Sequence, residues 1–510
     1  MGTQLVWLKR DLRVHDHRAL AAAAERGPVV CLYVYEPEVY LAEDFHPQHM
    51  VFINQSLREL SRSLKDIGGR LTVRKGRMPD VLDALMRECP FEAVWAHEET
   101  GNAITYDRDR RVRAWGKARG VPVRELWQNG VVRRLKNRDG WAKNWTKRMA
   151  SDIPETPALR TPAGLRHGRV TSLKALGLPE SDKTYVQTGG ESEGHRLLDS
   201  FLAERGVNYR KAMSSPVTGW TECSRLSPYF AYGNLSVRQA HQATAARQQQ
   251  LRDAKAAGED VDGRWLQSLS SFQGRLRWHC HFTQKLEDEP RIEFENMNRA
   301  YDGLRGETEG QFDEEWFAAW TEGRTGYPFV DAVMRSLHAT GWTNFRMRAM
   351  LVSFSSYHLW LHWRRPAVYL ARQFLDYEPG IHYPQHQMQS GVTGINTVRI
   401  YSPAKQLRDQ DPEGVFTRQY VPELARVPLK YLAEPHTMPA DVQREAGCVI
   451  GEDYPAPVVD HREAYALARS RVSAFRRRED VRAEADAVLK KHGSRRRPPD
   501  RRKARAKAGA

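Results

Sequence analysis

The sequence predicts two domains of different class: an α/β domain built on a doubly wound parallel sheet, followed by an all-α domain. Residues 1–130 contain five short apolar runs that alternate with four helical patterns. From residue 195 onward helical periodicity dominates and strand-like runs disappear. At 510 residues the chain is also long enough to form at least two hydrophobic cores.

The predicted strands of the first domain are apolar runs rich in β-branched and aromatic residues. They cover 3–9, 28–35, 71–76, 91–99 and 121–128, and the helices between them cover 15–27, 51–69, 79–89 and 105–120. This alternation is typical of parallel strands whose connecting helices cover both faces of a sheet. A dehydrogenase would be the first interpretation, but KRDLRVHD (9–16) stands where a dinucleotide fold needs its glycine-rich turn.

Composition changes divide the rest of the chain. Residues 131–194 are rich in Gly, Pro, Arg and Thr, and we expect them to form an interdomain connector on the surface. The helical domain is expected over 195–480. Residues 481–510 are expected to be a basic, disordered tail, because 490–510 hold ten Lys or Arg and one Asp, a net +9 of the chain's +16. Such a tail either binds polyanions without sequence preference or is simply a solvated end.

Composition also excludes several classes of protein. No apolar run approaches the roughly 18 residues that a membrane span needs. The opening MGTQLVWLKR leads directly into a strand, so no secretory leader is expected. The five cysteines are scattered and lack zinc-finger spacing, which suits a reducing, cytoplasmic location. We assign no metal site and expect a monomer that does not contact a membrane.

Three consecutive segments organise the helical domain. Residues 325–342 predict a helix with Pro328 in its first turn and Gly341 just past its end. Residues 344–365 predict a second, mostly apolar helix that closes before Pro366.

The third segment, 374–403, is rich in Gly, Pro and His and predicts a loop. The second segment would place Trp360 and Trp363 on one helical side. It also carries Arg348 among apolar neighbours, where an unpaired charge is very costly. Asp376 is the nearest candidate for its partner.

Two earlier motifs could bind a nucleotide or a nucleic acid. Ser224, Arg225 and Ser227 precede a predicted helix and could hold a pyrophosphate, although taken alone this short motif is better explained as an ordinary helix cap. Residues 265–286 form an aromatic helix with interleaved Arg and His, which suits stacking on an unpaired base and neutralising phosphates. A core helix with snorkelling arginines is the alternative.

The order of the later motifs resembles the flavin-binding core of the photolyase/cryptochrome family: TGYPFVDAVMR, GW, RMR, WR, DYE, RIYSPAKQ and PEGVFTRQYVPEL. The opening WLKRDLRVHDHRAL resembles the start of the same family, in which this domain can hold an antenna chromophore. The resemblance implies FAD as cofactor. It implies a second chromophore that could be a folate, a deazaflavin or absent. It also implies DNA with a pyrimidine dimer, duplex or single-stranded, as partner.

The resemblance carries functional residues over by position. Those expected to bind FAD are Tyr209, Cys223, Ser224, Arg225, Leu226, Ser227, Arg348, Asp376, Tyr377, Glu378 and His382. Those expected to contact DNA are Phe272, Arg275, Trp278, Phe345, Met388 and Lys405. Those expected to take part in the reaction are Arg275, Trp278, Trp363 and His386. Arg348 and Asp376 match the family's salt bridge beside the isoalloxazine ring.

Several of these positions depart from the family pattern. Cys223 stands where many relatives have Thr, and Glu378 stands where they have Asp. His382 falls where bacterial photolyases have Asn. Arg275 replaces a Glu that hydrogen-bonds the dimer in repair enzymes. Phe345 replaces the Asn of dimer enzymes and the catalytic His of (6-4) enzymes, which disfavours (6-4) chemistry.

The chain of tryptophans that re-reduces the flavin in this family is also altered. Trp363 matches its middle member, whereas His386 occupies the place of the member nearest the flavin. Imidazole is a poor one-electron donor, so the relay is either broken or rerouted through another tryptophan, Trp342 or Trp360.

The leading interpretation is a light-driven, FAD-dependent DNA photolyase that transfers an electron to a flipped pyrimidine dimer. The alternative is a cryptochrome-type photoreceptor without repair activity. A DNA-binding flavoprotein without photochemistry is the third possibility.

Overall fold

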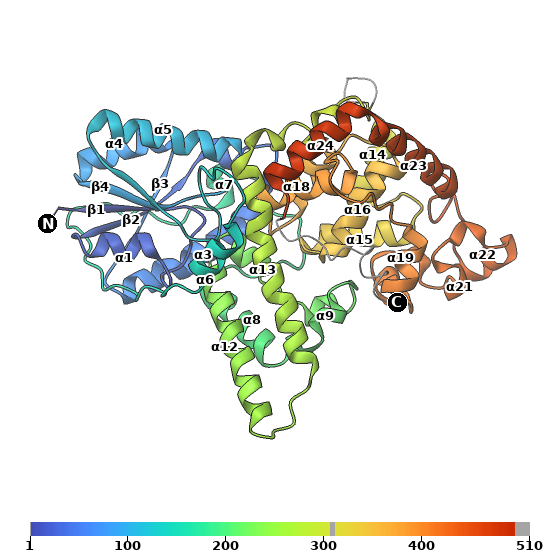
Figure 1. Cartoon of the computed structure of the whole chain (residues 1–510), viewed down its shortest axis with the longest axis horizontal. Coiled ribbons are helices and arrows are strands. Elements are labelled where there is room, and N and C mark those ends of the chain that lie inside the picture. Colours follow the sequence, from blue (N-terminus) through green and yellow to red (C-terminus); the bar gives the residue numbers. More distant parts are fainter. Residues whose placement is uncertain (1, 307–311, 495–510) are drawn as a thin grey trace, which may run out of the picture.

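The computed structural model describes residues 2–306 and 312–494, and it confirms the predicted fold class (Figure 1). A five-stranded, wholly parallel sheet forms the first domain, with strand order β3-β2-β1-β4-β5. The strands are β1 Gln4–Leu8, β2 Val29–Tyr35, β3 Leu71–Lys75, β4 Ala93–His97 and β5 Val123–Leu126. The order reverses between β1 and β4, and this switch point is where open α/β sheets bind ligands.

Helices cover both faces of the sheet. They are α1 Arg18–Ala24, α2 Pro37–Tyr40, α3 Pro47–Asp66, α4 Met78–Glu88 and α5 Ala103–Arg119. Alternate β1 residues point to opposite faces, as strand geometry requires. Val6 and Leu8 pack in one core with Leu60 of α3, while Leu5 and Trp7 pack in a second core with residues of α4 and α5.

The connector does not lie only on the surface. It contains the helices α6 Trp141–Met149 and α7 Leu173–Leu176. Trp141, Trp145 and Met149 of α6 are buried in a core shared with Phe52 of the sheet domain and Phe201 of the helical domain. These three side chains follow one another at intervals of four residues and so lie on one face of α6, which is held in place by their packing. The predicted domain boundaries themselves stay a prediction.

The described residues of the second domain form helices and loops but no strand, apart from one isolated bridge between Ile450 and Tyr454. Its first helices are α8 Glu191–Ala203, α9 Tyr209–Ala212, α10 Gly219–Glu222, α11 Ser227–Ala231, α12 Val237–Ala256 and α13 Arg264–Asp288. The next are α14 Glu314–Glu322, α15 Pro328–Thr340, α16 Phe345–Ser353, α17 Arg364–Gln373 and α18 Pro379–Ser390. The last are α19 Pro403–Gln410, α20 Val415–Tyr420, α21 Leu429–Leu432, α22 Ala440–Ala446, α23 His461–Arg477 and α24 Glu479–His492. In Figure 1 the ends of α12 and α13 project from the body as a hairpin.

The predicted single helix over 344–365 is wrong. After α16 the chain makes one π-helical turn, Phe354–His358, and then leaves the helix until α17 begins at Arg364. Trp360 adopts a left-handed backbone with φ 52°, so it does not share a helical side with Trp363. Pro366 lies in the first turn of α17, where a missing N–H costs little, so it does not mark a helix end.

The predicted loop over 374–403 is wrong for its residues 379–390, which form α18. Pro379 starts α18, Pro384 lies inside it, and Gly391 ends it with a left-handed φ of 80°. The helix packs very closely on α13, because a Cβ on Gly380 would come within 2.8 Å of the Thr283 Cα. Close packing against a neighbour explains how a Gly- and Pro-rich segment can stay helical here.

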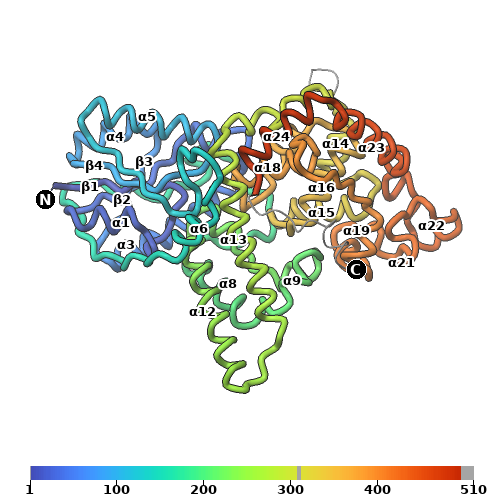
Figure 2. The backbone as a smooth tube through the Cα atoms, viewed as in Figure 1, coloured from blue at the N-terminus to red at the C-terminus, as the bar shows by residue number. Residues whose placement is uncertain are grey.

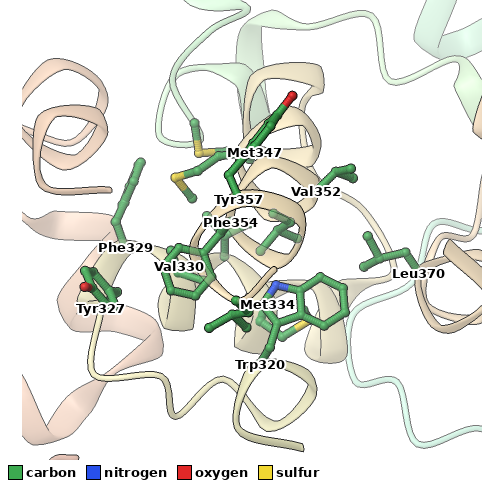
Figure 3. Close-up of a cluster of buried hydrophobic side chains, with 14 of the residues drawn as sticks. Trp320, Tyr327, Phe329, Val330, Met334, Met347, Val352, Phe354, Tyr357 and Leu370 are labelled. Atoms are coloured by element: carbon green, nitrogen blue, oxygen red, sulfur yellow. The ribbon is translucent and has the colours of Figure 1, made fainter. Parts of the chain in front are cut away.

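The largest core joins α15, α16 and α17 (Figure 3). Phe329, Val330 and Met334 of α15 are at most 1% exposed, as the helical spacing predicted, and Trp320 of α14 is fully buried with them. This core fixes α16, which carries Arg348.

Residues 479–492 are not a disordered tail. They form α24, whose Val481, Val488 and His492 are buried. Figure 2 shows this helix running back toward the carboxyl end of α13, where the His492 Nε2 lies 2.5 Å from a Glu289 carboxylate oxygen. Residues 495–510 lie outside the described residues, so the tail prediction stands for them alone. No helix that the structure describes is both long and apolar enough to span a membrane.

Candidate flavin site and its aromatic face

The predicted pair Arg348–Asp376 is confirmed. The Arg348 Nη2 donates to the Asp376 Oδ2 at 2.8 Å, and its Nε donates to the carbonyl of Thr343 at 2.9 Å. The guanidinium also lies 4.1 Å from the centre of the Phe374 ring. Three contacts on three sides fix this cation, and the loop before α18 brings the carboxylate to it.

The segment Cys223–Ser227 forms a tight turn into α11. Arg225 adopts a left-handed φ of 61°, and its guanidinium lies between the rings of Trp220 and Trp342, 4.0 and 3.7 Å from their centres. Burial lowers the pKa of Arg225 to about 10, so the side chain stays charged at neutral pH. Burial raises the pKa of the Cys223 thiol to about 12, so that group is neutral. The turn therefore offers one clamped cation and the free amide groups at a helix start.

Tyr209 and Phe272 do not face open solvent. The Tyr209 ring packs edge-on against Phe201 and Phe272, with centroids 5.4 and 6.0 Å away. Phe272 is only 3% exposed, so its ring cannot serve as the second wall of a base-binding pocket beside Trp278. The six-residue separation along α13 turns these two side chains to different faces of the helix.

Arg275 and Trp278 nevertheless lie on the exposed side of α13, and Phe345, the first residue of α16, lies beside Arg275. Trp278 and Phe345 are each 44% exposed, which is unusual for such large apolar rings. The Arg275 guanidinium lies 5.7 Å from the Phe345 ring and is exposed. We call Arg275, Trp278 and Phe345 the α13 face. Phe345 lies one helical turn before Arg348 on α16, so this face adjoins the Arg348–Asp376 pair.

The remaining predicted DNA contacts are less distinctive. Met388 is half-buried on α18. Lys405 is exposed and its Nζ lies 3.1 Å from the Asp409 Oδ2, four residues later on α19. Its charge is therefore partly balanced within its own helix.

Sequence reasoning missed the partner of Glu378. The Glu378 Oε1 lies 2.9 Å from the Nε2 of His279, which comes from α13. Burial opposes protonation of His279, but the Glu378 carboxylate and Cys280 together outweigh it and raise the pKa of His279 well above its ordinary value. The two side chains form an ion pair that joins α13 to the start of α18. A histidine directly after Trp278 in the aromatic helix was the available signal.

His382 and His386 stack one turn apart on α18, with ring centroids 4.1 Å apart. The His382 Nε2 donates to the carbonyl of Ala367 at 2.7 Å, and the His386 Nδ1 donates to the carbonyl of His382 at 2.8 Å. Burial lowers the pKa of both rings, that of His386 to about 4. Both imidazoles are therefore neutral at pH 7, and the His386 Nε2 is left as an acceptor.

The three tryptophans considered for electron transfer differ in their surroundings. Trp363 is fully buried and its Nε1 donates to the Asn296 Oδ1 at 2.8 Å. Guanidinium groups stack on the other two: Arg305 and Arg471 lie 4.8 and 5.0 Å from the Trp360 ring, and Arg225 lies on Trp342. A cation against an indole ring opposes loss of an electron from it. This contrast favours Trp363 as the donor.

Tyr377, expected to touch the cofactor, points toward the sheet domain instead. Its hydroxyl donates to the Asp44 Oδ2 at 2.6 Å, and its carbonyl accepts from the Arg10 Nη1 at 3.0 Å. The ring lines a cavity at the carboxyl ends of β1, β2 and β4, together with Glu36, Asp44 and Arg108. Tyr377 thus connects the two domains beside a second candidate ligand site.

The residues present fit a large polar cofactor in the helical domain. Among the described residues, the buried polar atoms without a hydrogen-bond partner include the Arg225 Nη1, the Asp376 Oδ1 and the His386 Nε2. Buried groups of this kind are normally satisfied, so they point to a ligand that supplies both donors and acceptors. Arg225 suits the phosphates, whereas Asp376 and His386 suit the polar edge of a flavin ring.

Two family models match the chain: "DNA photolyase" over residues 4–144 and "FAD binding domain of DNA photolyase" over residues 272–474. A cryptochrome DASH from Gloeobacter violaceus is 30% identical over 90% of this chain and 93% of its own length. A deoxyribodipyrimidine photo-lyase from Agrobacterium fabrum is 29% identical over 93% of this chain and 98% of its own length. A crystallised class III photolyase from Agrobacterium tumefaciens has 26% identity and a TM-score of 0.79, and the match covers 94% of this chain and 98% of that one. The chain therefore belongs to the photolyase/cryptochrome family and contains its FAD-binding domain.

Proposed function

We propose that this protein is a light-driven DNA photolyase that splits pyrimidine dimers. The observation that carries the proposal is the α13 face, where two aromatic rings and a guanidinium are exposed beside the Arg348–Asp376 pair. A photoreceptor that never binds a lesion has no need to keep Trp278 and Phe345 in water. Exposed aromatic and cationic groups together are what an extruded base and its phosphates require.

Each group on the α13 face has a distinct role. Trp278 supplies a stacking surface, worth roughly 1–3 kcal/mol per base. Arg275 either donates to the carbonyl oxygens of the dimer or neutralises a phosphate. Phe345 supplies an apolar ring that cannot donate a proton, so it cannot replace the catalytic His of (6-4) enzymes at this position.

The groups behind the face hold the cofactor. FAD, when bound, supplies a photoexcitable one-electron donor. The dimer accepts the electron, its two cyclobutane C–C bonds break, and the electron returns, so the reaction has no net redox change. Arg348 keeps a fixed positive charge near the ring, and the neutral His386 can accept a hydrogen bond without adding a second charge.

A cryptochrome-type photoreceptor is the second candidate, and Arg275 favours it. Repair enzymes of the family place a glutamate at this position, and a guanidinium cannot accept from the N–H groups of a thymine dimer. Relatives named as cryptochromes match this chain about as well as those named as photolyases.

We also propose an antenna chromophore in the cavity at the carboxyl ends of β1, β2 and β4. Its lining mixes Tyr33 and Tyr35 with the charged Glu36 and Arg108, which suits an aromatic ligand with polar edges. The residues do not distinguish a folate from a deazaflavin. A monomer in the cytoplasm, acting on duplex or single-stranded DNA, completes the proposal.

The test compares damaged and intact DNA. Reduced protein is mixed with an oligonucleotide that contains one cyclobutane dimer and is then illuminated, and the restored thymines are measured. We expect restoration in light only, and loss of both damage-selective binding and restoration in Trp278→Ala. No preference of the wild type for damaged DNA, together with no restoration in light, would favour the photoreceptor.

A further inference from the structure

Two groups of metal-ligand side chains lie outside the flavin site among the described residues. They are Asp11, His17 and His97 at the ends of β1 and β4, and His15, Glu191 and His195 at the seam between the domains. In each group the candidate ligand atoms all lie within 4.8 Å of one another. Their hydrogen bonds decide which group can bind a metal.

The buried group is a hydrogen-bond network. The His17 Nδ1 accepts from the backbone N–H of Leu20 at 3.1 Å, so in the neutral ring the proton sits on Nε2. That atom faces the Asp11 Oδ2 at 3.3 Å, and the His97 Nδ1 donates to the same oxygen at 2.8 Å. A metal needs an unprotonated ring nitrogen, which His17 cannot offer here. We therefore exclude this group.

His15, in the second group, is held rigidly in its loop. The next residue, Asp16, adopts a left-handed φ of 53° and forms a buried ion pair with Arg238 of α12. The Asp16 carboxylate also accepts from the Ser236 hydroxyl at 2.5 Å. The loop of the sheet domain is thus fixed by the helical domain, while the His15 side chain stays 60% exposed.

Glu191, the first residue of α8, is aimed at this loop. Its Oε2 accepts from the backbone N–H of Val14 at 2.9 Å, and its Oε1 accepts from the His15 Nδ1 at 2.9 Å. The Oε1 also accepts from the backbone N–H of His15 at 3.2 Å. A carboxylate oriented by backbone hydrogen bonds, with one oxygen turned to a histidine side chain, is a typical metal-ligand arrangement.

His195 follows one turn later on α8, and its tautomer suits a metal. Gln239 accepts from the backbone N–H of Ser236 through its Oε1, so its amide nitrogen is the atom that faces the His195 Nε2, at 3.5 Å. The His195 Nε2 is therefore unprotonated in the neutral ring. The same atom lies 4.0 Å from the Glu191 Oε1.

We propose that His15, Glu191 and His195 bind one divalent transition-metal ion, Zn²⁺ being the best match, across the two domains. Two histidines and one carboxylate are a common zinc set, with water as the fourth ligand. Tetrahedral bonds of about 2.0–2.2 Å require ligand atoms roughly 3–3.5 Å apart, so His195 must turn inward slightly. Its 38% exposure leaves room for that rotation and for the water.

The hydrogen bonds that these side chains form without a metal do not prevent metal binding. His15 donates to Glu191 through Nδ1, but its exposed ring can carry the proton on Nε2 instead, which frees Nδ1 for the metal. The buried Arg13 guanidinium interacts with Glu191 and opposes a second cation. We therefore infer an exchangeable ion. When bound, it links the β1–α1 loop to α8 and stabilises the contact between the domains.

The test uses untagged, full-length protein with its flavin, first treated with a chelator and then titrated with Zn²⁺ by calorimetry. We expect one ion per chain, and an affinity at least about tenfold lower in His195→Ala and in His15→Gln. His436→Ala is the matched control, because His436 is exposed on a different part of the helical domain. Flavin content of each variant reports that it is folded.

Co²⁺ provides a second measurement, since its visible absorption reveals tetrahedral coordination. We expect tetrahedral bands in the wild type and in His436→Ala, and none in His195→Ala. Zn²⁺ affinity unchanged in both His195→Ala and His15→Gln, or lowered equally in His436→Ala, would overturn the proposal.

Discussion

Asp376→Asn keeps the size of the side chain and removes its charge, so it isolates the role of the Arg348–Asp376 pair. The native Oδ2 accepts from the Arg348 Nη2 at 2.8 Å, and the carboxylate is almost fully buried, with 3% of the side chain exposed. The other oxygen has no partner among the described residues and is left for the cofactor. The substitution therefore weakens both the fold of the site and the binding of FAD.

The expected loss of stability depends on the contacts that Arg348 retains in the variant. Breaking a buried ion pair costs about 3–5 kcal/mol, and losing a hydrogen bond to a charged group costs about 1.5–3 kcal/mol. Arg348 is 25% exposed on its side chain and keeps its contacts with Thr343 and Phe374. We therefore expect a loss of about 2 kcal/mol in Asp376→Asn, which corresponds to roughly 30-fold weaker FAD binding if it falls on the bound state.

The assay is release of flavin during urea titration, followed by the rise in flavin fluorescence, with FAD occupancy measured on the purified protein. A single melting temperature is unsuitable for a chain with several cores. Asp409→Asn is the control, because its partner Lys405 and Asp409 itself are exposed and such pairs contribute little. Full occupancy and an unshifted release curve in Asp376→Asn would refute the assigned site.

Four further results are expected. Trp363→Phe should slow light-driven flavin reduction at least about tenfold. His386→Phe should leave the rate nearly unchanged, because imidazole is a poor one-electron donor. A slower rate in His386→Phe and an unchanged rate in Trp363→Phe would make His386 a member of the electron relay. Burial lowers the pKa of His386 from 6.5 to about 4, so between these pH values the unfolded chain binds a proton on this ring that the folded chain does not. The free energy of unfolding should therefore fall by about 3 kcal/mol as the pH drops from 6.5 to 4. His386→Phe should reduce this loss when urea unfolding at about pH 4.5 is compared with unfolding at about pH 7. Arg275→Ala should erase most of the preference for damaged DNA and leave intact-DNA affinity nearly unchanged if Arg275 reads the lesion; an equal fall in both affinities would make it a phosphate contact. Residues 495–510 hold eight Lys or Arg and one Asp. Their deletion should reduce the salt dependence of the affinity for duplex DNA and leave the flavin content unchanged. An unchanged salt dependence would show that these residues do not contact DNA.

The sequence was sufficient for the parts of the molecule that depend on local patterns. Short apolar runs located all five strands, and period-3.6 hydrophobicity located helix α15 with its Pro328 start and Gly341 end. The need of a buried arginine for a counter-charge was enough to pair Arg348 with Asp376. These predictions hold because the same residues that define the pattern also make the contact.

The sequence failed where packing between distant elements overrides local preference. The Gly- and Pro-rich segment became α18 because Gly380 allows it to lie against α13. Phe272 turned inward onto Tyr209, and residues 481–492, expected to belong to the disordered tail, became part of α24, whose Val481 and Val488 are buried in the main core. No local signal distinguishes these outcomes from a loop, an exposed ring or a disordered tail.

The partner of a polar residue could not be predicted either when it came from a distant part of the chain. Glu378 was expected to contact the cofactor, but it pairs with His279. Tyr377 was expected to do the same, but it bonds to Asp44 of the sheet domain. Both contacts depend on how α13 and the sheet meet the start of α18, which only the assembled fold decides.

The most direct test of the proposed function is a single-turnover repair measurement. Reduced, FAD-loaded protein is bound in the dark to an oligonucleotide with one cyclobutane dimer, and one light flash is given. We predict that restored thymines appear in proportion to the bound complex, that none appear in the dark, and that Trp278→Ala abolishes the signal while keeping its flavin. A complex that binds damaged DNA with fully reduced flavin yet yields no restored thymine after the flash would contradict the proposal.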